Sequence, residues 1–410
     1  MAHSHSHAHR HGPSSVDVAR GPVTVLLTFL ALTAVATVIG VVALWPDAHA
    51  VDTLRNQAQY AAPGVTFQKA RVTAVQKPCP PDQGQGDPNT SGSSASCGQI
   101  AAVLTDGPEL GATEKVGVPT AVAQSGLAAG DHVRLVRIPG TNGAPATYSF
   151  DDVIRLKPLW LLAALFVLVV AAVARLRGVL ALVSLGIGGA VLFKFMLPAL
   201  LSGSSGVAVA LVGSAAIMFV VLYLAHGPSI RTSAALAGTL LGVGVTAAVG
   251  QLAIHGATLS GFGDESAGLL SAFADNLSFQ GLLTCALVVA GLGVLNDVTI
   301  TQASAVWELR EAGPDLSRRT LFTSAMRIGR DHIASTIYTI VFAYAGSALA
   351  VLLLLSLYDR PLVELLSSES ISEEIVRTLA SGIGLVLAVP ITTAIAALTV
   401  VGPRSAPADR

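Results

Sequence analysis

The segment Val288–Arg310, VVAGLGVLNDVTITQASAVWELR, decides how the rest of the chain is interpreted. It begins as an apolar run suited to a lipid bilayer and then places Asn296 and Asp297 inside that run. At 3.6 residues per turn, one face of this helix carries Asp297, Thr301, Ser304 and Glu308. An ionised carboxylate inside a bilayer costs about 2.5–3.5 kcal/mol on insertion scales, so it usually faces protein or water. We therefore predict a membrane-spanning helix that carries the functional centre.

The composition of the whole chain agrees with this interpretation. Of its 410 residues, 52% are hydrophobic and only 12% are charged, whereas about a quarter of the residues in soluble domains are charged. Eight apolar runs are long enough to cross a membrane: Gly21–Leu44, Pro158–Ala174, Val179–Leu200, Val207–Ala225, Ser233–Ile254, Gly281–Ala305, Ile333–Leu357 and Leu379–Val400. The sequence thus predicts an α-helical integral membrane protein with about eight transmembrane helices.

Five regions follow one another along the chain. We expect a His-rich cytoplasmic tail (1–20), a first transmembrane helix (21–45), an extracytoplasmic β-rich domain (51–157), a seven-helix transmembrane bundle (158–400) and a cytoplasmic tail (401–410). The first apolar run is longer than the core of a signal peptide, which favours a retained helix over cleavage near Ala50. Loops rich in arginine alternate with loops that carry few or no basic residues, so both termini are predicted to be cytoplasmic.

The segment between the first two apolar runs has the composition of a soluble domain. Its strand-like runs, separated by turn signals, are Val65–Gln76, Gln99–Thr105, Glu114–Pro119, His132–Ile138 and Ala146–Val153. Five short strands in about 100 residues indicate a small OB-like barrel. Few aromatic side chains and no basic groove accompany them, so we expect no nucleic acid as a partner. Cys79 and Cys97 flank a Pro/Gly/Ser-rich insert and form either a disulfide bond or two free thiols.

The N-terminus places histidines at alternate positions: His3, His5, His7, His9 and His11. Such a tail binds Zn²⁺ or Ni²⁺ loosely. Two interpretations stay open, a tail with incidental metal affinity and a role in metal sensing or delivery. No other metal site and no cofactor is predicted.

The candidate transport or ion site centres on Asp297, with Asn296, Thr301, Gln302 and Ser304 beside it. Lys194 is one possible partner of Asp297. It lies about 24 Å from the cytoplasmic start of its helix, whereas Asp297 lies about 12 Å from the cytoplasmic end of its helix. The two groups thus differ by about 12 Å in depth, which is too far for a salt bridge. We therefore expect Lys194 to extend towards the outer headgroups. Partners in the next helix are more plausible: Ser335, Thr336 and Tyr338, with Arg327, Arg330 and Asp331 below them. A packing role for Asp297 is the alternative.

The segment Leu316–Asp331 has an apolar side and four arginines, which is typical of an amphipathic helix lying against anionic headgroups. We expect it to anchor the topology, or alternatively to couple or gate transport.

Several short motifs resemble those of the YibE/F family of bacterial multi-pass membrane proteins, from about Thr120 onward. They occur in this order: Gly291-Leu-Gly-Val-Leu-Asn-Asp297, Ser304-Ala-Val-Trp-Glu-Leu309, Leu316-Ser-Arg-Arg-Thr-Leu-Phe322, Ile328-Gly-Arg-Asp331, Phe342-Ala-Tyr-Ala-Gly-Ser347, Glu374-Ile-Val-Arg377 and Ala388-Val-Pro390. The resemblance implies a multi-pass membrane protein, and such proteins are often assumed to be permeases.

An enzymatic activity has no support in the sequence. It contains no HExxH, Walker A or nucleophile-elbow motif. Gly261-Phe-Gly-Asp264 matches the GxGD of intramembrane aspartyl proteases, but it stands in an outer loop and its order relative to Tyr358-Asp359 is reversed. We predict a secondary permease or exporter of a small solute or ion in the lipid bilayer of the cell membrane. The competing class is a scaffold or sensor, whose outer domain binds an envelope protein; homo-oligomerisation is compatible with both.

Overall fold

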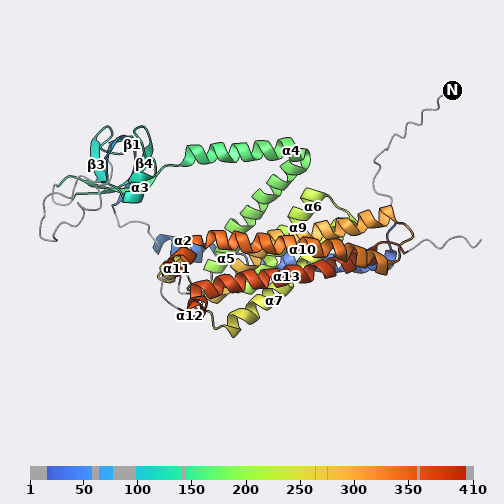
Figure 1. Cartoon of the computed structure of the whole chain (residues 1–410). Coiled ribbons are helices and arrows are strands. Elements are labelled where there is room, and N and C mark those ends of the chain that lie inside the picture. Colours follow the sequence, from blue (N-terminus) through green and yellow to red (C-terminus); the bar gives the residue numbers. More distant parts are fainter. Residues whose placement is uncertain are drawn as a thin grey trace, which may run out of the picture. The chain divides into compact units, whose positions relative to one another are not determined.

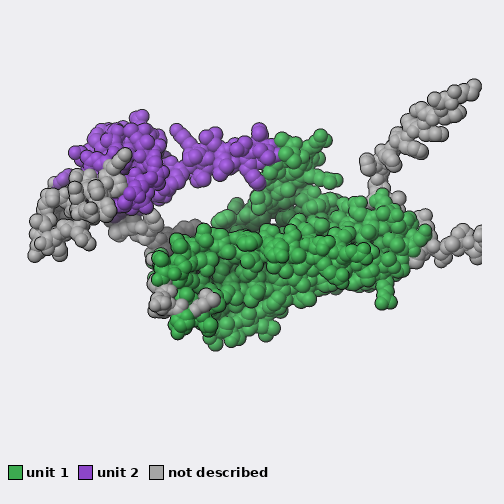
Figure 2. All heavy atoms as spheres, viewed as in Figure 1, with its two compact units in different colours: residues 1–57, 170–410 green, residues 58–169 purple. Residues whose placement is uncertain are grey.

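The computed structural model describes residues 16–57, 64–76, 98–140, 144–263, 265–274, 276–357 and 361–402. The chain divides into a helical unit, residues 1–57 and 170–410, and a β-rich unit, residues 58–169 (Figure 2). The histidine tail and the cysteine pair Cys79–Cys97 lie outside the described residues.

Six helical stretches of the described chain are long and apolar enough to cross a membrane (Figure 1). They are α1 (Arg20–Ala43), Leu156–Leu201, α6 (Gly206–His226), α7 (Ile230–Gly256), α9 (Phe279–Ala312) and α13 (Glu369–Thr399). A seventh span results if α10 (Arg318–Ser347) and α11 (Leu349–Leu357), which meet at a bend of 65°, count as one. The prediction of a helical multi-pass membrane protein is confirmed. Three short helices follow long ones: α2 (Ala48–Gln57) lies between α1 and the first strand, α8 (Glu265–Ser271) between α7 and α9, and α12 (Leu362–Leu366) between α11 and α13.

The count of six or seven candidate spans differs from the eight predicted helices. The runs Pro158–Ala174 and Val179–Leu200 are joined in one stretch, formed by α4 (Leu156–Val191), a π-helical turn (Leu192–Met196) and α5 (Leu197–Leu201). Within α4, Arg175 has φ 52° and ψ −137°, outside the helical region. Positive φ is uncommon for a residue with a side chain, so this residue marks a sharp break between two arms.

The segment Leu316–Asp331 also differs from the prediction. It does not form a separate surface helix, because α10 runs without interruption from Arg318 to Ser347. Ser317 caps its start, with the hydroxyl accepting a hydrogen bond from the backbone N–H of Thr320. The arginine-rich residues are therefore the first half of a long helix.

The centre of the helical unit is formed by α7, α9 and α13, which pack closely along glycines. A Cβ placed on Gly238 of α7 would lie 1.9 Å from the Thr392 hydroxyl oxygen of α13, and one on Gly384 of α13 would lie 1.8 Å from that of Thr246. The hydroxyls of Thr246 and Thr392 donate to backbone carbonyls four residues earlier. Small residues thus let the backbones approach, and the buried hydroxyls need no partner from another helix.

Three helix ends meet at one end of the helical unit. Val18, just before α1, pairs with Val400, just after α13, and the backbone N–H of Ala19 donates to the Thr399 carbonyl at 2.8 Å. The guanidinium of Arg318 at the start of α10 donates to the Val400 carbonyl at 3.1 Å. The starts of α1 and α10 and the end of α13 therefore lie at about one level, which serves below as the reference for depth.

The β-rich unit contains a curled five-strand antiparallel half-barrel in the order β3-β2-β1-β4-β5. Its elements are β1 (Thr66–Val75), β2 (Gln99–Leu104), β3 (Thr113–Gly117), α3 (Thr120–Gln124), β4 (His132–Ile138) and β5 (Thr147–Val153). All five predicted strands are present, with bounds shifted by no more than two residues. Alternate residues such as Val72, Ile100 and Leu135 fill the core.

One polar cluster fixes the loop between β2 and β3 to the sheet. Arg137 donates two hydrogen bonds to the Glu109 carboxylate, at 2.9 and 2.7 Å, and the Tyr148 hydroxyl donates a third at 2.6 Å. These bonds lower the pKa of Glu109 from 4.5 to about 2, the Arg137 bonds most strongly. Burial, followed by the contact with Glu109, raises the pKa of Tyr148 to about 12. Glu109 is therefore a permanently charged structural anchor at physiological pH.

Candidate functional site

The site predicted around Asp297 lies where α9 and α10 pack side by side in opposite directions. Gln302 of α9 fixes their register by donating from its side-chain amide to the Ala325 carbonyl of α10 at 2.8 Å. The turn between the helices is held by Arg310, which donates to the carbonyls of Pro314 and Leu316 at 2.8 and 2.9 Å. Residues equally distant from this turn therefore face one another.

This register brings Asp297 next to His332 of α10. The Nε2 atom of His332 lies 3.6 Å from Oδ2 of Asp297. The Asp297 side chain is 68% exposed, whereas that of His332 is 29% exposed. The separation exceeds a hydrogen bond, and the two groups attract each other as charges only when the imidazole is protonated. The pair is thus loose and open on one side.

The depth of this pair follows from the length of α10. His332 lies 14 residues after Arg318, which is about 21 Å along an α-helix from the level where the helix ends meet. The apolar helix α1 starts at that same level and extends for 24 residues, or about 36 Å. Asp297 and His332 consequently lie within the depth that α1 marks as apolar.

Two buried polar atoms of this region have no hydrogen-bond partner among the described residues: the side-chain oxygen of Asn296 and Nε2 of His332. Buried polar atoms are nearly always bonded, so an unpaired one points to water, an ion or a function. Next to them, the Thr299 hydroxyl lies 2.6 Å from that of Thr239 in α7, which closes the side towards the core. Of the two unpaired atoms, Nε2 of His332 lies between α9 and α10, beside Asp297.

The other predicted residues of α9 divide into two groups. Thr301 and Ser304 are half-buried and follow Asp297 along the same face of the helix, which ends in the exposed Glu308. Gln302 is fully buried and is used for the contact with Ala325. Gln302 is therefore a structural link between the helices, and Thr301 and Ser304 extend the open face.

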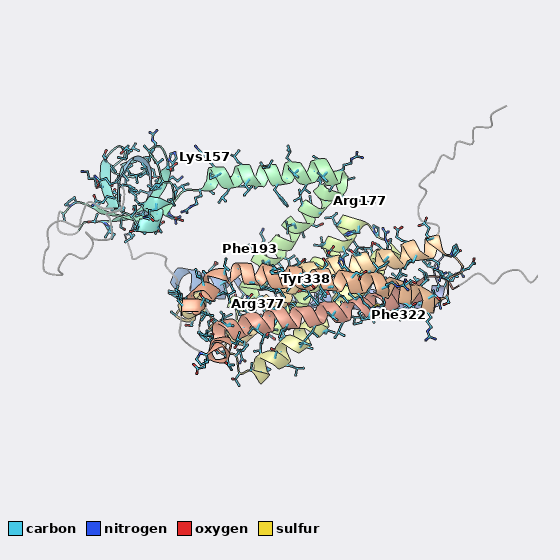
Figure 3. The ribbon with its side chains drawn as sticks, in the orientation of Figure 1. Lys157, Arg177, Phe193, Phe322, Tyr338 and Arg377 are labelled. Carbon is cyan, nitrogen blue, oxygen red and sulfur yellow. The ribbon has the colours of Figure 1, made fainter. Side chains whose placement is uncertain are left out.

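Among the described residues, no hydrogen bond or ion pair joins the predicted residues of α10 to Asp297. Arg327, Arg330 and Asp331 are exposed, and no ion pair in the described part of the chain joins either arginine to Asp297. Thr336 is buried and its hydroxyl donates to the His332 carbonyl at 2.8 Å. Tyr338 is 64% exposed on α10 (Figure 3). Thr336 supports the backbone of His332, and the others line the outside of the helix.

Lys194 takes no part in this site. It lies exposed in the π-helical turn, whose buried neighbours Phe195 and Met196 pack on Trp45 and Gly213. Within the described ranges no carboxylate pairs with Lys194. This placement agrees with the depth argument against a contact between Lys194 and Asp297.

Sequence reasoning missed two residues. His332 stands directly after the predicted Asp331, and its equal distance from the α9–α10 turn is the signal that could have revealed it. Arg310 is only 6% exposed, and its Nε and Nη2 atoms have no described partner. Its position at the end of a polar helix face suggests an exposed charge, and only the tight turn explains its burial.

The site offers proton and weak cation chemistry. A carboxylate beside an imidazole can hold or pass a proton near neutral pH. The Asn296 oxygen and the Asp297 carboxylate could together supply oxygens to a monovalent cation. No group of three or more His, Cys, Asp or Glu suited to a metal ion occurs in the part of the chain that was searched.

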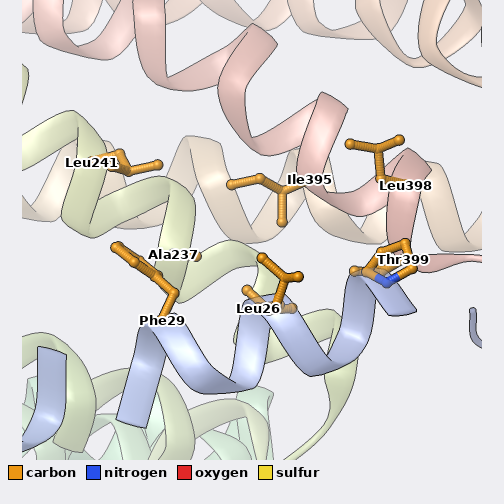
Figure 4. Close-up of a pocket in the computed structure, with 9 residues that line it drawn as sticks. Leu26, Phe29, Ala237, Leu241, Ile395, Leu398 and Thr399 are labelled. Atoms are coloured by element: carbon orange, nitrogen blue, oxygen red, sulfur yellow. The ribbon is translucent and has the colours of Figure 1, made fainter. Parts of the chain in front are cut away.

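Two cavities of the helical unit lie away from this site. One of about 490 Å³ lies between α1, α7 and α13 and is lined by apolar side chains and Thr399 (Figure 4). Another, of about 210 Å³, lies at the opposite end of α13, beside Glu373, Glu374 and Arg377. Neither includes Asp297 or His332 in its lining, so the candidate site is an open face rather than a closed pocket.

Comparison with known proteins gives one match. A family model described as YibE/F-like protein matches residues 162–402, which include α9, α10 and α13. Neither the curated proteins nor the solved structures contain a match. The matched residues cover the site, whereas the half-barrel lies outside them.

Proposed function

This chain belongs to the YibE/F-like family, and from that premise we propose that it is a secondary permease or exporter of the bacterial cell membrane. Its proton or cation site is the pair formed by Asp297 and His332. The substrate is a small solute or ion.

This proposal rests on one observation: a carboxylate and an imidazole from two helices lie at a depth that α1 marks as apolar. Their side chains make no hydrogen bond to the described residues, and Asp297 is 68% exposed. A charged side chain at such depth is expensive and usually serves a substrate or proton pathway. A carboxylate that served packing alone would be buried and fully hydrogen-bonded. Asp297 is exposed, and the loose contact with His332 is its one ion pair among the described residues.

The close packing of α7, α9 and α13 directs the path to the other side of α9. Because glycine contacts such as Gly238 against Thr392 fill the space between these helices, a solute cannot pass there without their separation. The face with Asp297, Thr301 and Ser304 beside the polar half of α10 supplies hydrogen-bonding groups along a wet route instead.

The proposed topology places both termini in the cytoplasm and residues 51–157 outside. It requires an even number of crossings. Eight result when the break at Arg175 separates two spans and α10 with α11 forms one. The arginines of α10 and of the chain break then lie on the cytoplasmic side, in agreement with the distribution of positive charge.

The outer half-barrel would gate the path or collect substrate. We propose that it is OB-like, because β1 pairs with both β2 and β4, and the end strands β3 and β5 approach each other without a described ladder between them. An open seam of this kind is common in OB-folds.

A non-transporting scaffold or sensor is the second candidate. The closely packed α7–α9–α13 core favours it, since an anchor needs rigid helices and no path. The half-barrel would then bind an envelope partner, and Asp297 would be dispensable.

Proton movement in proteoliposomes tests the proposal. The full chain is reconstituted with the pH dye pyranine trapped inside, and metal cations and metabolites are added outside singly. The panel is chosen by comparing the metabolite and metal content of cells with and without the protein. A substrate should change the internal pH with the wild-type chain, and Asp297→Asn should abolish this response. Glu308→Gln, on the same helix face, is the matched control and should retain it.

The scaffold gives the opposite pattern. Asp297→Asn would then leave the cellular phenotype intact, whereas deletion of residues 51–157 would remove it. A correctly folded Asp297→Asn chain with wild-type proton response contradicts the permease.

A further inference from the structure

The apolar cavity between α1, α7 and α13 is a groove with an open side (Figure 4). Its walls are Pro22, Val25, Leu26 and Phe29 of α1, Ala237 and Leu241 of α7, and Ile395, Leu398 and Thr399 of α13. Val25 is 70% exposed and Leu398 53% exposed, so both rims face the surroundings of the helical unit. The groove is therefore reachable from the bilayer.

The path of α1 explains why the groove exists. At its start, the pairing of Val18 with Val400 holds α1 against the end of α13. Near its end, α1 packs against α6, where a Cβ on Gly40 would lie 2.6 Å from Val212. The helix thus moves from one neighbour to another, and the described residues leave about 490 Å³ unfilled between these two contacts.

The chemistry of the walls selects a hydrocarbon. None of the lining residues is titratable, and the one lining hydroxyl, that of Thr399, already donates to the Ala396 carbonyl at 2.8 Å. A polar solute would lose its hydrogen bonds to water and gain none here. The groove also lies beside the first turns of α1, at the depth of a lipid chain.

Charges at the near end of the groove favour an anionic headgroup. Arg20 is exposed and precedes Pro22 by two residues, about 3 Å along α1. Arg231 precedes Ala237 by six residues, about 9 Å along α7. Neither arginine has an ion-pair partner in the described ranges, and Asp17 nearby is already engaged in another interaction. Basic residues at this level attract anionic phospholipids.

We propose that this groove is a phospholipid site, in which one acyl chain packs between α1, α7 and α13 and the anionic headgroup lies over Arg20 and Arg231. Only Leu26, Leu30 and Thr37 of α1 are buried by the protein, so the bound chain completes the packing of this helix. The site does not depend on transport through the α9–α10 face.

Native mass spectrometry of the purified full chain tests the site. Phosphatidylglycerol and phosphatidylcholine with identical acyl chains are added at increasing concentration, and bound lipids are counted. The wild-type chain should retain one phosphatidylglycerol more tightly than phosphatidylcholine. Val25→Trp, which fills the groove, should remove the tight binding of both lipids. Leu27→Trp is the matched control, since it lies at the same depth on another face of α1 and is already 44% exposed.

A second variant keeps the test valid if Val25→Trp fails to fold. Arg20→Gln combined with Arg231→Gln changes one exposed and one half-buried side chain and leaves the apolar walls of the groove intact. Each basic residue near a membrane surface contributes about fivefold to the binding of anionic lipid, so the pair should weaken phosphatidylglycerol binding roughly thirtyfold and leave phosphatidylcholine unchanged. Equal binding of the two lipids to the wild-type chain, or an unchanged phosphatidylglycerol affinity in this variant, overturns the proposal.

Discussion

The two sides of α9 treat polar groups in opposite ways. Towards α7 and α13, Thr299 is buried, its hydroxyl is bonded, and glycines bring the backbones into contact. Towards α10, Asp297 is exposed and lies 3.6 Å from Nε2 of His332, which makes no hydrogen bond to the described residues. One side is therefore built for fixed packing, and the other retains groups that can change their protonation or bind an ion. The side of α9 towards α7 and α13 therefore stabilises the bundle, whereas the side towards α10 carries the candidate functional groups.

The packed side should be the more sensitive to added volume. Gly384→Leu places atoms where the Thr246 hydroxyl lies 1.8 Å from the new Cβ, so it should cost about 3 kcal/mol, the upper part of the range for overpacked cores. Gly382→Leu is the control, because a Cβ there meets no atom of another described element within 4 Å. Equilibrium unfolding in mixed micelles measures both. Equal stability of the two variants would mean that α7 and α13 are not closely packed.

Substitutions on the α10 side of α9 should change transport activity rather than stability. If Asp297 and His332 act as one unit, the proton response in proteoliposomes should be lost in Asp297→Asn and in His332→Gln, and the double variant should be no worse than either. Unfolding midpoints of all three should stay close to the wild type. Additive losses from the two single changes would show that the residues act separately.

The sequence predicts much of this contrast. The helical period correctly places Asp297, Thr301, Ser304 and Glu308 on one face, and period-two patterns locate all five strands. The helical period cannot show which neighbouring helix this face points towards. Nothing in the sequence indicates that it points away from α7 and α13. His332 was missed for a related reason, since its pairing depends on where the α9–α10 turn begins and on the burial of Arg310 that shapes it. The break in α4 at Arg175 results from a strained backbone conformation, which no pattern of residues in the sequence predicts.

Glu109 of the half-barrel is a tightly bonded carboxylate, in contrast to the loosely paired Asp297. Glu109 accepts two hydrogen bonds from Arg137 and one from Tyr148, and its pKa falls to about 2. A lowered pKa stabilises the folded state above the ordinary value of 4.5, and this contribution disappears as the pH falls from 4.5 towards 2. The rate of amide hydrogen exchange in residues 99–153, corrected for the intrinsic rates, should therefore increase as the pH falls from 4.5 towards 2.

Glu109→Gln should flatten this acid dependence, because the neutral amide has no proton to gain. Glu114→Gln on β3 is the control, since none of the described residues bonds its carboxylate, and it should keep the wild-type profile. An unchanged profile in Glu109→Gln would assign the acid response of the half-barrel to other groups.

The smallest expected effect lies at the boundary between the two sides of α9. The Thr239 and Thr299 hydroxyls lie 2.6 Å apart, yet each also donates within its own helix, to the Ala235 carbonyl at 3.0 Å and the Asn296 carbonyl at 3.1 Å. Only one of these hydroxyls can donate to the other, and doing so gives up its own backbone bond. The contact between the helices should therefore be worth about 0.6 kcal/mol, the average for hydrogen bonds between membrane helices.

A double-mutant cycle of Thr239→Val and Thr299→Val measures this coupling from unfolding in mixed micelles. Thr393→Val on α13 is the reference, because its hydroxyl donates to the Val389 carbonyl of its own helix and to no other helix of the described chain. A coupling near zero would mean that the packed side of α9 is held by shape alone. A coupling well above about 1.7 kcal/mol, the largest value found for such bonds, would mean that Thr299 also fixes the Asn296 carbonyl and hence the position of Asp297.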